Sequence, residues 1–567
     1  MMTLLVDKTR QTRTLLIGSL LALWSAIPLC SAAPAVPKWS RFEQSFQSAA
    51  DYANPIQEAA LTVEFMSPSG TKLKAYGFWD GGKAWKVRFL PNEAGKWAFT
   101  TTCSNAKDTG LHGQMGSFDC AAPMGDGRFQ KHGPLKVSAD GFYLTHDDGT
   151  PFFWLADTAW NGALLSTPEE WQTYLKERSR QSFSAVQWVA TQWRAAPTGD
   201  LNKQLAFTGR DKITVNPEFF QRLDTKADEL NRAGLLNVPV LLWAIGSGAN
   251  PESNPGNGLP EDQAILLARY MVARWQGNYV AWILPGDGHY FGQEGEKWKR
   301  IGRAVFGDIP HAPVSLHPQG RHWNWHDFKD ESWMGIIGYQ SGHGDSDEHL
   351  RWMTTEGPAV KDWKLAPHRP FINLEPAYEN HLGYQSHKPI SADLTRRILY
   401  WSLLNTPTAG VSYGGHGVWG WDDGTKPPTD HAGTGVPMAW PKALNMPCAQ
   451  QMTNLASFFN SLEWWRLRPV PQAVVNNPGG QNPRKFVAAA STEKKDLTLV
   501  YVPEDRTIEI RMDALPASPE IRWFNPRTGE KSPAVAVVTD TSCQFPTPAE
   551  GDWILIMTSQ EKAKAGQ

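Results

Sequence analysis

The sequence lacks a strong net charge, an abundance of cysteine and, beyond its N-terminus, any long apolar run. Its 567 residues carry a formal net charge of −2 and five cysteines. A chain so close to neutrality has no electrostatic reason to bind nucleic acid or an anionic membrane surface. No segment after residue 35 is apolar enough to cross a bilayer. We therefore expect no nucleic-acid partner and no membrane span in the mature chain.

The N-terminus has the pattern of a secretory signal peptide. Lys8, Arg10 and Arg13 precede an apolar run over residues 15–29, and small residues follow over 31–35. The apolar run is too short to span a membrane comfortably. We expect residues 1–35 to be removed and the mature protein to be secreted or periplasmic.

Few cysteines remain for disulfide bonds in that oxidising compartment. Cys103 and Cys120 are close enough in sequence to staple one small domain. The sequence leaves open whether Cys448 and Cys543 pair with each other or stay free.

The pattern of predicted secondary structure changes twice along the chain, which predicts three folded parts. Short strands divided by turns fill residues 36–123 and again 470–558, and that spacing is typical of β-sandwiches. Between them, over 133–468, buried strands alternate with helical patterns that begin at prolines such as Pro168 and Pro217. Eight such strands predict an α/β fold, a (β/α)8 TIM barrel flanked by two β-sandwich domains. The predicted barrel strands are 152–156, 185–190, 238–244, 280–284, 314–317, 335–339, 371–374 and 411–413.

A doubly wound sheet is the rival fold, and it lacks its signature here. Such a sheet would have a glycine-rich phosphate turn after its first strand, whereas this chain has Asp157-Thr-Ala-Trp160. For the N-terminal domain, packing against the catalytic domain is the role we favour over sugar binding.

Tryptophan is the unusual residue, with 27 copies, and many lie next to Gly, His, Asn or Asp. Broad faces with a donor edge suit ligands that are apolar-faced and hydroxylated, as sugars are. Large core residues are the alternative reading. In a barrel the functional groups lie at the C-terminal strand ends, and nearly every predicted strand ends on an aromatic or polar group. The substrate-binding candidates are Asp157, Trp160, Gln187, Trp243, His289, His317, Gln340, His343, Tyr378, Tyr413 and Trp419.

Two carboxylates stand out, Asp287 after the fourth predicted strand and Glu375 after the seventh. These strand ends lie on opposite sides of a barrel mouth, so the two groups can flank one sugar. Retaining glycoside hydrolysis uses such a pair, about 5–5.5 Å apart, as a nucleophile and an acid that later serves as base. We predict Glu375 to be the nucleophile and Asp287 to be its partner.

Other roles for these acids remain possible at this stage. Glu375 could form a buried salt bridge with Arg369 or Arg396, and Asp287 could turn a loop. Asp157 is a third candidate, which we expect to hold substrate hydroxyls. Glu294 and Glu379 are rivals, although the first falls at a helix start and the second in a loop.

Other chemistries lack their motifs. The chain has no Gly-x-Ser-x-Gly nucleophile elbow, and its first barrel strand lacks the His-x-His pair of metal-dependent barrel hydrolases. The histidines at 289, 317, 343 and 416 could meet around a metal, but donation to sugar hydroxyls is the more economical role. We expect no metal and no other cofactor.

Five motifs resemble one known family. Residues 148–160 resemble the opening of the apiosidase-like catalytic domain, glycoside hydrolase family 140. Four more motifs follow in the same order: Arg274-Trp-Gln-Gly-Asn-Tyr-Val-Ala-Trp-Ile-Leu-Pro-Gly-Asp287, Gln340-Ser-Gly-His343, Glu375-Pro-Ala-Tyr-Glu379 and Tyr413-Gly-Gly-His-Gly-Val-Trp419.

The resemblance covers about residues 133–468 and implies a retaining barrel enzyme that releases apiose-linked side chains from the pectin rhamnogalacturonan-II. It also implies Asp287 as acid/base and Glu375 as nucleophile. Gly286-Asp287 departs from the Asn-Glu that many related barrel glycosidases carry. The segment 523–529 is similar to a domain family labelled collagen-binding, for which we expect a structural role.

The sequence thus predicts a secreted glycosidase acting on a poly- or oligosaccharide. One alternative is the same mechanism acting on a different sugar, because indole and imidazole side chains do not specify which sugar ring binds. Another is a carbohydrate-binding protein on a barrel without activity. The presence of both Asp287 and Glu375 argues against the latter, since a binder needs neither.

Overall fold

A computed structural model describes residues 35–245 and 253–559 of the chain. The expected signal peptide, residues 1–35, lies almost wholly outside these ranges. Within them, no helix has the length and hydropathy that a membrane span requires.

The centre of the fold is an eight-stranded sheet in which every hydrogen-bonded neighbour is parallel. The strand order is β17-β16-β15-β12-β11-β20-β19-β18, which is the order of a barrel opened at one seam. At that seam, between β17 and β18, the backbone N–H groups of Gly335 and Ile336 donate to the carbonyl of Val314. The prediction of an α/β barrel is therefore confirmed. The strands are β11 (Trp154–Thr158), β12 (Ala185–Val189), β15 (Leu236–Trp243), β16 (Trp282–Gly288), β17 (Val314–Pro318), β18 (Ile337–Gln340), β19 (Phe371–Glu375) and β20 (Gly410–Tyr413).

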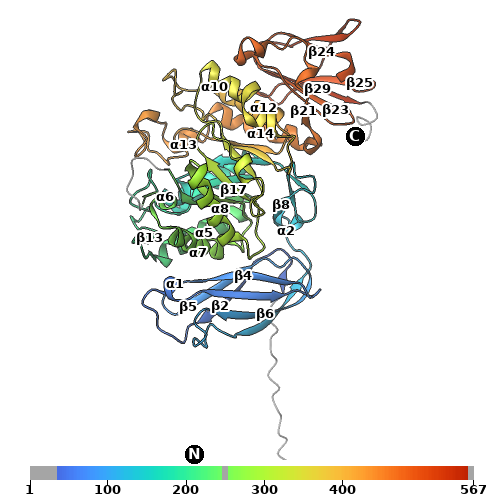
Figure 1. The fold of residues 1–567 in the computed structure, drawn as a ribbon. Helices are drawn as coiled ribbons and strands as arrows, with labels where there is room; N and C mark the ends of the chain where they lie inside the picture. Colours follow the sequence, from blue (N-terminus) through green and yellow to red (C-terminus); the bar gives the residue numbers. More distant parts are fainter. Residues whose placement is uncertain (1–34, 246–252, 560–567) are drawn as a thin grey trace, which may run out of the picture. The chain divides into compact units, whose positions relative to one another are not determined.

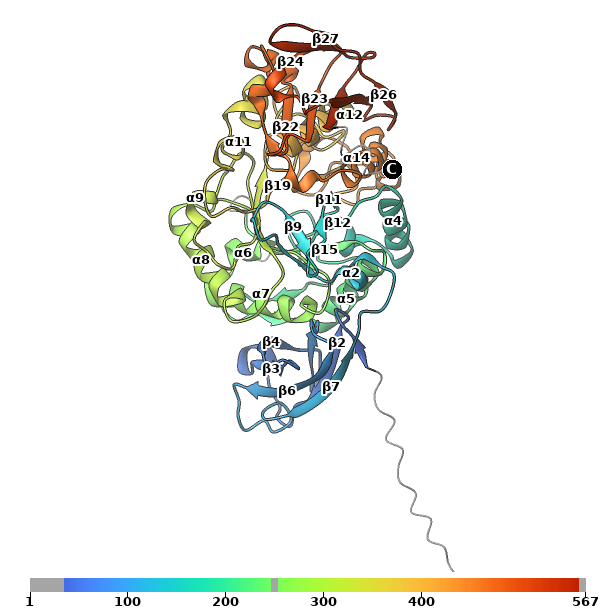
Figure 2. The same cartoon turned by 90° about the vertical axis from the view of Figure 1, so that its right-hand side faces the viewer.

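Helices lie around these strands (Figure 2). Their starts follow local chemistry: Thr167 and Glu170 form a reciprocal capping box ahead of α4, and Pro168 occupies its first turn. The helix predicted over 348–360 is instead broken into α10 (Asp347–Arg351), a π-helical turn (Trp352–Glu356) and α11 (Pro358–Asp362). Pro358 explains the break, because it lacks an N–H and disfavours a helical residue before it. The main barrel helices are α4 (Pro168–Arg180), α5 (Pro217–Arg232), α7 (Glu261–Trp275), α8 (Gly292–Phe306), α12 (Ala392–Leu404) and α14 (Pro447–Asn460).

The N-terminal part is a β-sandwich (blue in Figure 1). Alternate side chains of its strands, among them Phe65, Val87 and Trp97, form a separate apolar core. Its strands are β1 (Val36–Pro37), β2 (Phe42–Gln47), β3 (Leu61–Met66), β4 (Lys72–Trp79), β5 (Ala84–Phe89), β6 (Gly95–Cys103) and β7 (Met115–Ala121).

The geometry of this sandwich rules out the disulfide that the sequence suggested. Cys120 pairs with Gly95 at the start of β6, whereas Cys103 ends that strand. At about 3.3 Å per residue the two thiols lie about 25 Å apart, far beyond bonding reach. Cys448 and Cys543 are also free, buried thiols.

The C-terminal part is a second sandwich, made of two sheets with a common core that includes Val500, Ile510 and Leu555. A short hairpin-like sheet of β8 (Leu135–Val137), β9 (Leu144–His146) and β10 (Pro151–Phe152) leads into the barrel. The C-terminal strands are β21 (Arg468–Pro469), β22 (Ala488–Ser491), β23 (Leu497–Val502), β24 (Thr507–Arg511), β25 (Pro519–Phe524), β26 (Lys531–Pro533), β27 (Val537–Val538), β28 (Ser542–Pro546) and β29 (Trp553–Ser559).

Buried charge joins the N-terminal sandwich to the barrel. Asp224 on α5 accepts from Arg88 of β5 at 2.9 Å and from Arg274 of α7 at 2.7 Å. Arg274 also contacts Asp80, which follows β4, at 2.9 Å. Arg274 is fully buried and Asp224 is 8 % exposed, so these charges have little water to replace a lost partner.

We expect Asp224→Asn to lower the free energy of unfolding by about 3 kcal/mol, because it leaves two buried guanidinium groups short of a counter-charge. Chemical denaturation monitored by tryptophan fluorescence measures this change. The control is Glu64→Gln, which removes an exposed ion pair with Lys72 and should cost about 0.5 kcal/mol or less. Equal losses in the two variants would contradict a stabilising role for the buried network.

Candidate active site

A cavity of about 360 Å³ opens at the C-terminal ends of the barrel strands. Both carboxylates singled out above line it, Asp287 from β16 and Glu375 from β19. Six other expected site residues also line it, so eight of the thirteen lie at the cavity. The lining residues are Trp160, Trp193, Arg194, Trp243, Ile245, Asp287, Gln319, Gly320, Gln340, His343, Glu375, Tyr378, His381, Tyr384, Trp419, His431 and Thr434.

Two glycines place Asp287. The fourth strand begins later than expected and continues through Gly288, with register shifts beside β17. A Cβ on Gly286 would lie 2.5 Å from Val240, and one on Gly288 would lie 2.7 Å from the Tyr290 hydroxyl. Asp287 itself has φ +45°, a conformation that costs energy for a residue with a side chain. The Gly-Asp-Gly sequence therefore lets the strand bend tightly and hold a carboxyl group at the cavity.

The environment of Asp287 favours its protonated form. Burial and the nearby negative charge of Glu375 together raise the pKa of Asp287 from 3.8 to about 6. The imidazole of His317 and the guanidinium of Arg194 oppose this rise only in part. Asp287 can thus hold a proton at mildly acidic pH, as a general acid must.

Glu375 is in the opposite state. It is 7 % exposed, and burial alone would raise its pKa, but contacts with His317 and His343 outweigh burial and hold the pKa of Glu375 well below its usual range. His343 Nε2 lies 3.0 Å from Glu375 Oε1, and His317 Nε2 lies 3.3 Å from Oε2. Glu375 is therefore an ionised carboxylate with an imidazole at each oxygen.

The tautomer of His343 follows from its second nitrogen. The backbone N–H of Tyr378 donates to His343 Nδ1 at 3.2 Å, so Nδ1 must be the bare nitrogen. The ring proton then sits on Nε2, which donates to Glu375 Oε1. His343 therefore donates to the carboxylate through Nε2 and accepts from the backbone through Nδ1.

Neither arginine proposed as a salt-bridge partner reaches Glu375. Arg369 donates to the backbone carbonyls of Lys329 and Glu331, and Arg396 pairs with Asp552 at 2.7 Å. The salt-bridge alternative for Glu375 is therefore wrong.

Five of the expected substrate contacts do not line the cavity. Asp157 is fully buried and accepts from Arg178 and Tyr174, each at 2.7 Å, so we now assign it to the support of the barrel rather than to substrate hydroxyls. Gln187 is held inside the barrel by the Leu374 carbonyl and the Ser412 hydroxyl.

The other three of these five have different surroundings. His317 lies beneath Glu375 with no exposed surface. The Tyr413 hydroxyl donates to Glu379 at 2.7 Å. His289 is exposed and its ring is tilted against that of His322, with 4.5 Å between ring centroids.

The rival carboxylates have structural partners. Glu379 accepts from the backbone N–H groups of Cys448 and Ala449 at the start of α14, where a helix attracts negative charge. Glu294 lies in the first turn of α8, half exposed, 3.6 Å from Lys297. Among the residues that the structure describes, no three His, Cys, Asp or Glu side chains gather as a metal site would require.

Sequence reasoning missed several lining residues. Trp193 and Arg194 follow β12, His381 and Tyr384 follow β19, and His431 lies in the loop after β20. Their sequence signal is weak, because each stands well beyond a strand end and only the path of its loop brings it to the cavity. An unusual density of Trp and His in these loops was the available clue.

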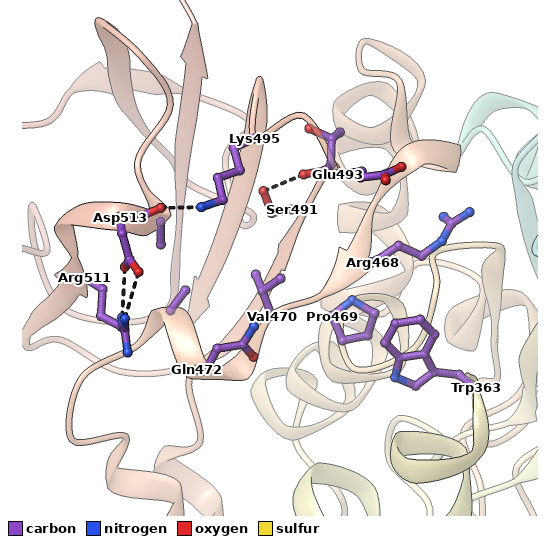
Figure 3. Close-up of a pocket in the computed structure, with 13 residues that line it drawn as sticks. Trp363, Arg468, Pro469, Val470, Gln472, Ser491, Glu493, Lys495, Arg511 and Asp513 are labelled. Carbon is purple, nitrogen blue, oxygen red and sulfur yellow. Dashed lines mark hydrogen bonds and ion pairs between the residues drawn. The ribbon is translucent and has the colours of Figure 1, made fainter. Parts of the chain in front are cut away.

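A second cavity, of about 460 Å³, lies between Trp363 and strands of the C-terminal sandwich (Figure 3). Most of its charged groups are already paired within the protein: Arg511 pairs with Asp513, Lys495 donates to the Asp513 carbonyl and Arg468 pairs with Asp140. It has no carboxylates in contrasting states like those at the barrel mouth, so the smaller cavity is the candidate active site.

Comparison with protein families finds matches in three successive parts of the chain. Residues 138–466 match the family "Apiosidase-like, catalytic domain". Residues 35–104 match a domain of unknown function, and residues 469–558 match the family described as "Putative collagen-binding domain of a collagenase". No protein with a curated description matches the chain.

Solved structures share the fold at low sequence identity. A "putative glycoside hydrolase" from Bacteroides vulgatus is 17% identical, with a TM-score of 0.70 over 93% of this chain and 100% of that chain. A glycoside hydrolase family 5 protein from the same organism is 20% identical, with a TM-score of 0.64 over 76% of this chain and 94% of that chain. At these identities the likeness concerns the fold.

The raised pKa of Asp287 predicts a pH-dependent penalty on stability. Its folded pKa of about 6 exceeds an unfolded value of about 3.9, so the folded state loses stability as pH rises from about 4 through 6. Asp287→Asn removes that penalty and should raise Tm relative to the wild type at pH 8, with the difference shrinking towards pH 4. Calorimetry at several pH values measures it, and a pH-independent difference would contradict the shift.

Proposed function

Because the chain belongs to the apiosidase-like catalytic-domain family, we propose that it is a retaining glycoside hydrolase with Glu375 as nucleophile and Asp287 as acid/base. The observation that carries the proposal is the contrast between the two carboxyl groups. One is held ionised by two imidazoles, and the other is held protonated by burial and by its neighbour's charge. Glycosidases need this division of roles at one site.

The chemistry then follows in two steps. Glu375 attacks the anomeric carbon while Asp287 gives its proton to the glycosidic oxygen, so the bond to the leaving sugar breaks and a glycosyl-enzyme ester forms. In the second step the ionised Asp287 takes a proton from water, whose oxygen attacks the anomeric carbon. The ester breaks, Glu375 is released as a carboxylate, and the product keeps its anomeric configuration.

The donor to Glu375 fits this cycle. His343 donates to Glu375 through Nε2 while its Nδ1 accepts from the Tyr378 N–H, so it orients the attacking carboxylate. Trp160, Trp243 and Trp419 supply aromatic walls suited to the apolar faces of a sugar. A carbohydrate binder without activity has no need of carboxyl groups in opposite protonation states, which disfavours that alternative.

For the substrate, we propose side chains of a plant-type polysaccharide, with apiose-linked side chains of the pectin rhamnogalacturonan-II first. The support is the family resemblance of the site motifs together with an N-terminal sequence typical of export. The same mechanism on another sugar linkage is the second candidate. A panel of aryl glycosides and pectic oligosaccharides, with the product anomer identified by NMR, decides between them.

Glu375→Gln and Asp287→Asn should each lower kcat by about 10³-fold or more, because one removes the nucleophile and the other the proton donor. Initial rates on the best substrate of the panel measure the loss. The matched control is Glu294→Gln, which alters an exposed carboxyl group outside the cavity and should keep normal rates. Near-normal activity in either cavity variant would remove that residue from its assigned role.

The dependence of kcat/KM on pH should reflect the titration of Asp287. As pH rises through the pKa of about 6, Asp287 loses the proton that it must donate, so kcat/KM should fall above that pH. Glu375 stays ionised until far lower pH, so the acid side of the profile should be broad. Stopped assays across pH 3.5–9 test this, and an activity still rising above pH 7 would assign the proton donor elsewhere.

A further inference from the structure

Two histidines that the mechanism does not use line the active-site cavity, His381 and His431. In each, ring nitrogen Nδ1 faces a backbone carbonyl: the Leu382 oxygen at 2.7 Å and the Thr429 oxygen at 2.8 Å. A carbonyl oxygen can only accept a hydrogen bond, so Nδ1 must carry the proton. In a neutral ring, Nε2 is then a bare acceptor.

The surroundings keep both rings neutral. Burial lowers the pKa of His381 well below its ordinary value, and the neighbouring His343 and His416 lower it further, against the opposing charge of Glu375. Burial also lowers the pKa of His431. Around His431, Arg194 acts in the same direction, while Asp430 and Glu375 act against it.

Neither Nε2 has a hydrogen-bonding partner within the described parts of the chain. His343 differs, since its Nε2 is already used by Glu375. An acceptor nitrogen at a cavity wall is satisfied only by water or by a donor on a ligand. Sugar hydroxyls are such donors.

Both rings lie close enough to the nucleophile Glu375 to respond to its charge. His381 stacks on His343, the partner of Glu375, with 4.1 Å between ring centroids. His431 packs against Trp419 at 5.0 Å and is close enough to Glu375 to respond to its charge. Since the nucleophile attacks the anomeric carbon of the glycone, groups around it contact the glycone rather than the leaving group.

We propose that His381 and His431 each accept a hydrogen bond from a different hydroxyl group of the glycone. The site then selects sugars in which both of these hydroxyl groups are free. This inference rests on the proposed function and names the substrate class for that site. The rings are obligate acceptors, because their only protons are committed to backbone carbonyls. An O-methylated sugar offers an ether oxygen there, which cannot donate, and leaves the nitrogen unpaired.

The test compares enzyme variants on matched substrates. His381→Phe and His431→Phe keep a flat ring and remove both nitrogens, and each variant is assayed on the preferred aryl glycoside and on its mono-O-methyl derivatives. The wild type should prefer the free hydroxyl over the methyl ether by about tenfold or more at two positions. Each Phe variant should lower kcat/KM on the parent glycoside and lose that preference at one position, a different position for each variant.

His146→Phe is the matched control. His146 is also buried, and its Nδ1 also faces a backbone carbonyl, that of Gly133 at 2.8 Å, but it lies outside the cavity. It should leave the preference for free hydroxyls unchanged. If the cavity variants lower the rates on parent and methylated glycosides equally, the histidines act only through packing and the proposal is overturned.

Two further measurements distinguish a failure of this inference from a failure to fold and from a failure of the proposed function. If His381→Phe does not fold, His381→Gln offers an amide oxygen instead and should retain part of the preference. A complete loss of preference in a normally folded His381→Gln variant would count against the acceptor role.

If no glycoside is hydrolysed, the proposed function fails. The same preference is then measured as the binding of methyl glycosides and their O-methyl derivatives by tryptophan fluorescence, where equal affinities in wild type and variants overturn the inference.

Discussion

Two carboxyl groups share one buried cavity, and the repulsion between them is the constraint on which the site depends. Glu375 is buried and Asp287 is only partly exposed, so water screens the two charges poorly and the neighbouring groups determine which carboxyl group is ionised. The negative charge rests on Glu375, because His317 and His343 approach its two oxygens, whereas His317 and Arg194 offset the effect of burial on Asp287 only in part. The asymmetry lies in the neighbours and not in the acids themselves. It gives the two groups distinct roles before any substrate arrives.

The barrel supplies the rigid surroundings that such an asymmetry needs. Beneath the cavity, Arg178 and Asp157 form a fully buried pair, and Gln187 ties β12 to β19 and β20. Groups held in this way cannot turn to screen the carboxylates, so the local charges keep their full effect. Asp287 pays for its position in backbone strain, at φ +45° between two glycines that larger residues could not replace without clashes. Strain of this kind is stable only in a well-packed frame.

The barrel and its two carboxylates could be predicted from the sequence, because both depend on patterns of neighbouring residues. Buried runs between helical segments define the strands, and an acid at the end of such a run reads as functional. The same logic misplaced Asp157, since a strand end does not say whether its side chain faces the mouth or an arginine such as Arg178. It also could not find His381 or His431, whose position depends on long loops. The suggested disulfide between Cys103 and Cys120 is absent because Cys103 ends β6, whereas Cys120 on β7 lies beside the start of β6, and closeness along the chain does not reveal that register.

The residues proposed to catalyse the reaction lie on strands, whereas the residues proposed to bind the sugar lie on loops. Glu375, His317 and Asp287 belong to β19, β17 and β16, whose hydrogen bonds fix them to the barrel. Arg194, His381 and His431 stand on the loops that follow other strand ends. Loops tolerate change better than strands, so the contacts to the sugar can vary while the carboxyl pair stays in place. A barrel of this kind can therefore change its glycone without rebuilding its mechanism, which is why the strand residues define the reaction and the loop residues must be tested to define the sugar.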